Sequence, residues 1–293
     1  MADEPVTLSA FLIANPIYLY VLVGLLGLLV GSFLNVVILR LPVMLEREWS
    51  RDCRALLEME EEMEEESFSL AFPGSHCPSC KAPIKAWQNI PVISFLLLRG
   101  QCGNCGTTIG WRYPAVEAMT AVMSVFVAIY SGWSVELGAY LILTWALIAL
   151  SVIDIDTQLL PDNITMPLLW AGLLFNLFYG EVLLADAVLG AAAGYLILWS
   201  VYWLFKLATG KEGMGFGDFK LLAALGAWMG WQAVPMIILL SSAVGAVLGI
   251  VILTLSGKGR SQALPFGPYL AMAGWIMLLW GDQISNAVLG GGF

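Results

Sequence analysis

Two groups of residues in this sequence have the types and the spacing to do chemistry. Four cysteines form the pairs CPSC at 77–80 and CGNC at 102–105, with 21 residues between the pairs. Several aspartates stand beside long apolar stretches: Asp154 and Asp156 end one stretch, and Asp218 begins another. The cysteines could hold a metal ion, and the carboxylates could exchange protons with water and a substrate.

The cysteine pairs match the spacing of a zinc site. A C-x-x-C turn brings two thiolates to one ion, and two such turns supply the four sulfurs of a tetrahedron. We therefore predict a structural zinc ion bound by Cys77, Cys80, Cys102 and Cys105. Such a site would be closed, because all four ligands come from the protein. The alternative is two pairs of free or redox-active thiols.

The aspartates differ in their surroundings. Asp162 precedes an apolar segment and is predicted to cap a helix there. Asp154 ends an apolar segment without a basic neighbour, whereas Asp156, two residues later, is expected to reach solvent. Asp218 could simply be a first-turn acid favoured by the helix dipole. The glycines of GMGFGD, residues 213–218, indicate more, because they remove side chains where backbone approaches closely or turns sharply.

The elements that must position these residues are membrane helices. The chain is 59% hydrophobic and 12% charged, with a mean hydropathy of +0.83. We predict an all-α polytopic membrane protein with about eight transmembrane helices and a small cytoplasmic zinc-knuckle module. The predicted spans are residues 17–39, 113–131, 136–153, 164–180, 185–207, 217–231, 233–255 and 264–281, of which the sixth is short for a full crossing.

Basic residues predict the orientation of these spans. Eight of the 13 Lys and Arg residues lie between Arg40 and Arg112, and the other five fall near the ends of later spans. With both termini outside, all 13 lie in or beside cytoplasmic segments. The predicted organisation is then a first helix in 1–40, a cytoplasmic zinc loop in 41–112 and a seven-helix core in 113–293. The first span lacks a basic n-region and is expected to stay uncleaved.

This topology brings the polar segments 154–163 and 208–217 to the same membrane face. Two carboxylates at one face predict aspartyl protease chemistry, in which the pair shares a proton and divides the roles of acid and base. A serine–histidine–aspartate system is not expected, because the sole histidine, His76, adjoins the cysteine pair. An HExxH zinc protease motif is also absent from the sequence.

Four motifs, taken together in this order, resemble those of bacterial type IV prepilin peptidases. They are GSFLNVVILRLP at 31–42, the double C-x-x-C loop, VIDIDTQLLPD at 152–162 and LPFGPYLA at 264–271. In addition, GFGD at 215–218 matches the GxGD signature of membrane aspartyl proteases. The resemblance runs from residue 31 to 271, which is nearly the whole chain.

The resemblance implies a bifunctional enzyme of the bacterial inner membrane. It would remove the short basic leader of type IV prepilins or pseudopilins and methylate the new N-terminal residue with S-adenosylmethionine. The family's two catalytic aspartates correspond to Asp154 and Asp218, with Asp156 as the competing candidate in the DID sequence. The implied partners are these substrates and membrane lipid, with no nucleic acid. The resemblance names no residues for methyl transfer or for binding the methyl donor.

Two alternatives concern the charged residues. The aspartates could serve a transporter as ion or proton sites, with the zinc knuckle as a regulatory module. Ten of the 22 acidic residues lie between Glu46 and Glu66. Their densest part, the acidic cluster 58–66, could attract a basic leader, although a solvated surface explains it more simply.

Overall fold

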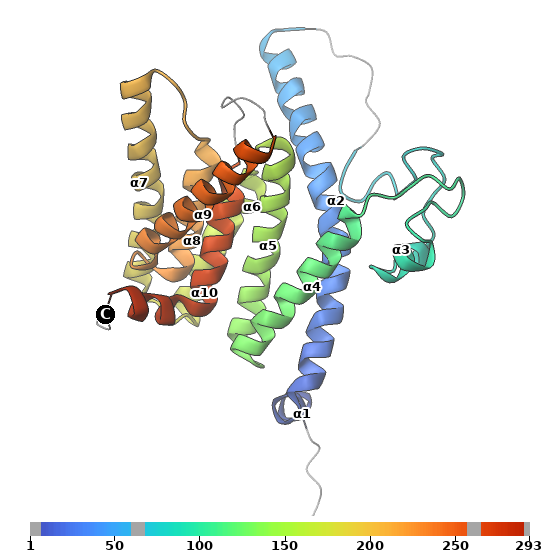
Figure 1. Ribbon diagram of the computed structural model, residues 1–293, viewed down its shortest axis with the longest axis horizontal. Helices are drawn as coiled ribbons and strands as arrows, with labels where there is room; N and C mark the ends of the chain where they lie inside the picture. Colours follow the sequence, from blue (N-terminus) through green and yellow to red (C-terminus); the bar gives the residue numbers. More distant parts are fainter. Residues whose placement is uncertain (1–6, 60–67, 257–264, 290–293) are drawn as a thin grey trace, which may run out of the picture. The chain divides into compact units, whose positions relative to one another are not determined.

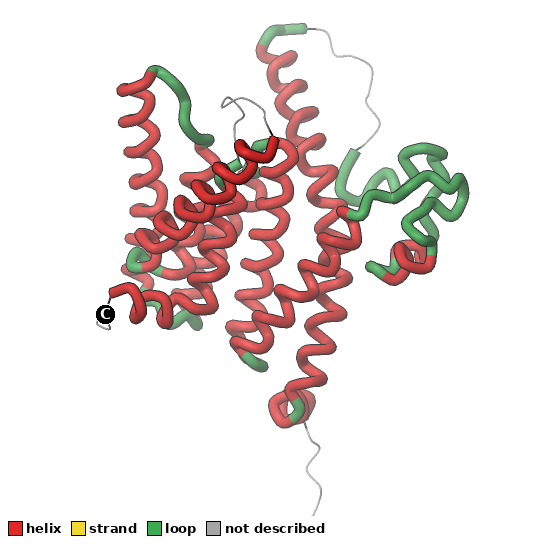
Figure 2. The backbone as a smooth tube through the Cα atoms, viewed as in Figure 1, coloured by secondary structure: helices red, strands yellow, loops and turns green. Residues whose placement is uncertain are grey.

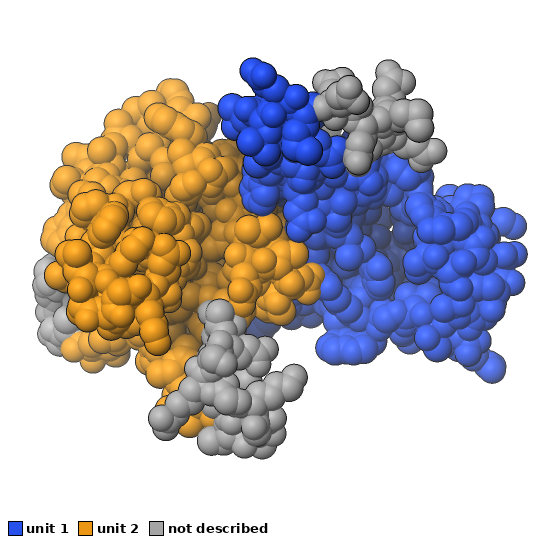
Figure 3. All heavy atoms as spheres, turned by 90° about the horizontal axis from the view of Figure 1, so that it is seen from above, with its two compact units in different colours: residues 1–137 blue, residues 138–293 orange. Residues whose placement is uncertain are grey.

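The computed structural model describes residues 7–59, 68–256 and 265–289, with side chains omitted after residue 251 in the second range. The rest of the acidic cluster, from residue 60, and the basic residues Lys258 and Arg260 lie outside the described residues. The chain divides into two compact units, residues 1–137 and 138–293 (Figure 3). The described part of each unit is helical, without a β-strand (Figure 2).

The helices follow the predicted apolar segments. In chain order they are α1 (Leu8–Ala14), α2 (Pro16–Leu56), the 3-10 helix η1 (Ala86–Asn89), α3 (Ile93–Leu97), α4 (Arg112–Ser131), α5 (Val135–Thr157), α6 (Asp162–Phe178), α7 (Leu184–Thr209), α8 (Phe216–Met229), α9 (Ala233–Ser256) and α10 (Gly267–Leu289) (Figure 1). All eight predicted spans correspond to one helix each, which confirms the all-α fold.

Five helices among the described residues are long and apolar enough to cross a membrane: α2, α4, α5, α7 and α9. The other three predicted spans, α6, α8 and α10, fall short in length or in apolar composition. Helix α8, the short sixth span, has only 14 residues and is buried among its neighbours. Many of its side chains, including Leu221 and Leu225, have no exposed surface.

In the first unit, α2 and α4 lie side by side (Figure 1). A Cβ atom built on Gly31 would lie 2.7 Å from the Cα of Glu117 and 3.1 Å from the Cβ of Thr120. Gly27 faces the Cα of Ala121 in the same way, also at 2.7 Å. Small residues at this spacing let two membrane helices approach at backbone distance. Glu117 is thereby held in the contact between α2 and α4.

Helix α2 is longer than the first predicted span. It has 41 residues and continues through Pro42 to Leu56, into the segment predicted as the start of the loop. The added turns consist largely of Leu, Met, Glu and Arg, which favour helix formation. At 1.5 Å per residue the helix is about 60 Å long. That is about twice the thickness of a bilayer's hydrocarbon core.

In the second unit, α8 is the central helix and contacts α6, α7, α9 and α10. Trp228 of α8 donates its indole N–H to the carbonyl of Leu168 on α6, at 2.9 Å. The Asn176 side chain of α6 donates to the carbonyl of Trp228 at 3.0 Å. On α10, Trp275 donates to the hydroxyl of Thr144 on α5 at 3.1 Å. These bonds satisfy polar groups that a membrane core would not solvate.

Candidate active site and metal centre

Asp154 lies near the end of α5, and only 5% of its surface is exposed. Its Oδ2 atom accepts a hydrogen bond of 3.0 Å from the backbone N–H of Gly267, the first residue of α10. A Cβ atom on Gly267 would lie 2.7 Å from that oxygen, so the contact requires glycine. The N-terminus of α10 therefore directs a backbone donor at a buried carboxylate.

Asp218 lies in the first turn of α8 and is 6% exposed. Its own N–H donates to the carbonyl of Gly215, at 3.3 Å. Its carboxyl group lies close enough to that of Asp154 for the two negative charges to repel each other. The structure thus brings together the ends of segments that are more than sixty residues apart in sequence. Asp156, the competing candidate, is exposed.

Leu160 packs against the start of α8, which carries Asp218, and against the start of α10, which contacts Asp154. A Cβ atom on Gly217 would lie 2.7 Å from the Cβ of Leu160, and one on Gly267 would lie 3.1 Å from its Cδ2. Both glycines thus adjoin one leucine side chain. Sequence reasoning did not single out Gly267 or Leu160, although both lie in motifs that it quoted.

The glycines before Asp218 have separate structural roles. A Cβ atom built on Gly213 would lie 2.9 Å from the ring of Phe205, so the glycine packs closely against that ring. Gly217 packs against Leu160 in the same way. A Cβ on Gly215 would meet nothing closer than the Asp218 carboxylate, at 3.9 Å. None of the three has a positive φ, so none of them is required for a left-handed backbone conformation. The expected close approach of neighbouring groups is present at Gly213 and Gly217.

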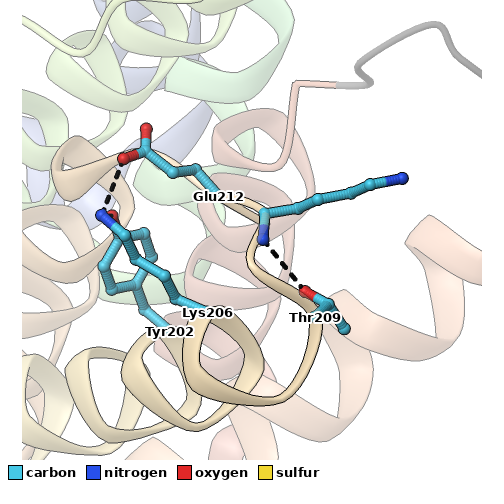
Figure 4. Close-up of polar contacts among 5 residues, drawn as sticks. Tyr202, Lys206, Thr209 and Glu212 are labelled. Atoms are coloured by element: carbon cyan, nitrogen blue, oxygen red, sulfur yellow. Dashed lines mark hydrogen bonds and ion pairs between the residues drawn. The ribbon is translucent and has the colours of Figure 1, made fainter.

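The turn after α7 is anchored before it leads to Asp218 (Figure 4). The ammonium group of Lys206 donates to Glu212 at 2.9 Å and to the Tyr202 hydroxyl at 3.2 Å. The backbone N–H of Lys211 donates a hydrogen bond to the hydroxyl group of Thr209, also at 3.2 Å. These bonds fix the start of the glycine-containing segment on the end of α7.

The prediction that Asp162 caps α6 is wrong. The residue before the helix is Pro161, and the structure shows no side-chain cap there. Both oxygens of Asp162 instead accept hydrogen bonds of 2.7 Å from the ammonium group of Lys220 on α8. The cation attracts the carboxylate away from the end of its own helix. This ion pair joins α6 to α8 two residues beyond Asp218.

The four cysteines of the predicted metal site converge in the first unit. All four sulfur atoms lie within 4.8 Å of one another, and those of Cys77 and Cys105 are 3.8 Å apart. Tetrahedral zinc with bonds of about 2.3 Å requires sulfur separations of about 3.8 Å. The donor set and its spacing therefore fit zinc. The fifth cysteine, Cys53, is exposed on α2 and is not part of the cluster.

The two cysteine turns repeat each other at an offset of 25 residues. Cys77 N–H donates to Ala82 at 2.9 Å, and Cys102 N–H donates to Thr107 at 2.8 Å. Isolated bridges close the turns at equivalent places, between residues 76 and 83 and between residues 101 and 108. The residue four positions after the first cysteine has a positive φ in both turns. The related sequences HCPSCKAPI and QCGNCGTTI carried this signal, which sequence reasoning missed.

Hydrogen bonds favour the thiolate forms of two of these cysteines. The hydroxyl of Thr107, 3.2 Å from the sulfur of Cys105, lowers the pKa of that thiol to about 6. The side chain of Asn104 donates to Cys80 at 3.5 Å and lowers the pKa of Cys80 as well. Thiolates are the forms that bind metal ions.

Comparison with known proteins agrees with the division of the chain into residues 1–137 and 138–293. Residues 25–131 match the bacterial peptidase A24 N-terminal domain, and residues 141–250 match the type IV leader peptidase family. Relatives named prepilin leader peptidase/N-methyltransferase include one from Stutzerimonas stutzeri, 56% identical, with 95% of this chain and 96% of the relative aligned. Another, from Neisseria gonorrhoeae, is 52% identical, with 91% of this chain and 92% of the relative aligned.

No solved structure is significantly similar to the chain. These two relatives, however, align with it over more than nine-tenths of their length, and more than half of the aligned residues are identical. The chain therefore belongs to the type IV leader peptidase family.

Proposed function

We propose that this protein is an aspartyl endopeptidase that removes the leader peptide of type IV prepilins or pseudopilins. The observation that carries the proposal is the pair of buried, interacting carboxylates of Asp154 and Asp218. The names of the curated relatives support the substrate class. The same names favour a peptidase over the alternative of an ion-coupled transporter.

The proposed reaction divides acid and base roles between the two aspartates. One ionised carboxylate accepts a proton from water, and the water oxygen attacks the scissile carbonyl carbon. The protonated partner donates to the carbonyl oxygen as the tetrahedral intermediate forms. The C–N bond then breaks, and a proton transferred from the pair leaves with the new amino group. Burial of Asp154 and Asp218 favours sharing one proton over ionising both groups.

The same proposal includes a location. The enzyme would span the bacterial inner membrane, surrounded by lipid, with both termini outside and the aspartates at the cytoplasmic face. The asymmetric distribution of basic residues supports this orientation. A basic leader would remain in the cytoplasm, next to the proposed catalytic pair.

The second proposed activity is methylation of the amino group that cleavage releases, with S-adenosylmethionine as the methyl donor. The relatives' names include N-methyltransferase, which supports this activity. Zinc bound by Cys77, Cys80, Cys102 and Cys105 would be structural, because its four protein ligands leave no open position.

The test is a reaction with purified full-length protein in lipid and a synthetic prepilin peptide. Mass spectrometry should detect the released leader and, with S-adenosylmethionine present, a methylated mature peptide. Cleavage without methylation would leave the peptidase proposal intact and reject the second activity. An intact peptide, with protein that retains its helical content, would reject the proposal as a whole.

A further inference from the structure

A cavity of about 490 Å³ lies within the first unit, between α2, α4 and the two cysteine turns. Its wall includes Asn35 of α2, Glu117 of α4, Thr107 of the second cysteine turn and the ring of Tyr113. The volume falls within the range of about 300–1,000 Å³ that is typical of small-molecule sites. All of the described residues that line the cavity belong to the first unit, whereas Asp154 and Asp218 belong to the second.

Glu117 is the buried acid of this cavity, with 8% of its surface exposed. Its Oε2 atom accepts a hydrogen bond of 2.8 Å from the N–H of Val92, and Ser32 lies beside the same carboxylate. Val92 has a φ of 59°, a conformation that β-branched residues rarely adopt. The chain thus directs neutral hydrogen-bond donors at a buried acid, as a buried polar group requires.

Two other polar side chains of the cavity wall, Asn35 and Arg40, are engaged with the protein itself. Asn35 donates to the carbonyl of Tyr113 at 3.1 Å. The guanidinium group of Arg40 donates to the carbonyls of Ser69 and Pro73, at 2.9 and 2.7 Å. Arg40 therefore holds the segment before the first cysteine turn. Among the described residues that line the cavity, Glu117 is the one that carries a carboxyl group.

We propose that this cavity binds the methyl donor S-adenosylmethionine, with Glu117 pairing with a positive group of that ligand. The inference rests on the proposed methyl transfer. S-adenosylmethionine carries a sulfonium and an ammonium group, which suit a buried carboxylate. Its adenine ring suits a wall that contains the aromatic rings of Phe95 and Tyr113.

The division of the chain supports the same site. The part that matches the leader peptidase family, residues 141–250, contains both candidate catalytic aspartates. The cavity lies in the part that matches the N-terminal domain, residues 25–131. A protein with two activities needs a second place for the second chemistry, and this cavity is a pocket of suitable size there.

The first experiment locates the ligand without a mutation. Full-length protein in lipid is irradiated with tritiated S-adenosylmethionine, digested and mapped by mass spectrometry. The label is expected on peptides from residues 32–40 or 75–117, and excess unlabelled S-adenosylhomocysteine should prevent it. A label confined to residues 138–293 would overturn the inference.

The second experiment measures binding by equilibrium dialysis for Glu117→Gln. Loss of the charge should weaken S-adenosylmethionine binding by about tenfold or more, because a charge-assisted bond is lost. Prepilin cleavage should stay within about twofold of the unmodified protein. Glu181→Gln removes an exposed carboxylate between α6 and α7 and serves as the matched control, with unchanged binding. Unchanged binding by Glu117→Gln, or an effect only on peptide KM, would overturn the inference.

A cavity-filling variant covers the case in which Glu117→Gln does not fold. Val36→Phe adds volume to the cavity wall on α2 and should also weaken binding while cleavage continues. If the unmodified protein neither binds S-adenosylmethionine nor methylates a cleaved peptide, the methyl-transfer proposal fails together with this site. If it does both, and the label and the variants point elsewhere, only this site is rejected.

Discussion

The two units carry their polar chemistry in different ways. In the second unit, Asp154 and Asp218 lie on helices, are almost fully buried, and are held by contacts among α5, α8 and α10. In the first unit, four cysteines lie on turns outside the helices, and Cys105 is exposed. The aspartate site is built by helix packing, whereas the cysteine site consists of turns whose four sulfur atoms could be joined by one metal ion. Substitutions in the second unit should therefore lower the rate of cleavage, whereas substitutions of the cysteines in the first unit should mainly lower the zinc content.

The largest effect should come from removing a carboxylate. Asp154→Asn and Asp218→Asn should each lower kcat for prepilin cleavage by at least about 100- to 10,000-fold, because a proton acceptor or donor is lost. Methylation of a peptide supplied already cleaved should continue. Asp156→Asn, at an exposed position, is the control and should retain cleavage. Cleavage by Asp154→Asn combined with inactivity of Asp156→Asn would reverse the assignment within DID.

The next effect concerns the support of Asp154. In Gly267→Ala, the added Cβ would lie 2.7 Å from the carboxylate oxygen and displace it. A displacement of about 1 Å in a catalytic group can cost about 100-fold, so we expect kcat to fall by that order. Gly138→Ala adds the same methyl group on α5, where nothing lies within 4 Å, and should cleave normally. Equal activities of the two variants would show that α10 does not position Asp154.

The third effect concerns the predicted zinc ion of the first unit, which should be lost when one of its cysteine ligands is replaced. Purified protein should contain about one zinc ion per chain, and Cys105→Ser should abolish most of that content, measured by atomic emission. Cleavage should fall by no more than a few-fold, because the aspartates lie in the other unit. Cys53→Ser changes an exposed cysteine outside the cluster and should keep the zinc. Protein without zinc that still carries four reduced thiols would support the free-thiol alternative.

The smallest effect concerns the ion pair between Lys220 and Asp162. It is partly exposed, with side-chain exposures of 29% and 56%, so its loss should cost at most about 1 kcal/mol of stability. Lys220→Ala should nevertheless lower cleavage a few-fold, because the pair joins α6 to α8 beside Asp218. The exchange of both charges, Asp162→Lys with Lys220→Asp, should restore part of the activity. A double variant no better than either single variant would indicate that the pair itself is unimportant.

Much of this arrangement could be predicted from the sequence. The apolar segments predicted the helices, and the cysteine spacing predicted the four sulfurs that converge. Periodicity could not predict that the N–H of Gly267 reaches Asp154, 113 residues earlier, because that contact depends on how the helices pack. The same holds for Lys220, which changes the role of Asp162 from a cap to an ion-pair partner. The cavity at Glu117 also required the close approach of α2 and α4, which two glycines permit.

The repeated cysteine turns also bear on how such a module could have arisen. Each turn of about ten residues has its own hydrogen bonds and supplies two of the four sulfurs, so neither can complete a tetrahedron alone. Two separate copies of one turn could do so as a pair of chains around one ion. Tandem duplication would place both copies in a single chain, and the later sequence changes would leave the backbone pattern intact. By this reasoning, exchanging residues 76–83 with residues 101–108 should preserve the metal site.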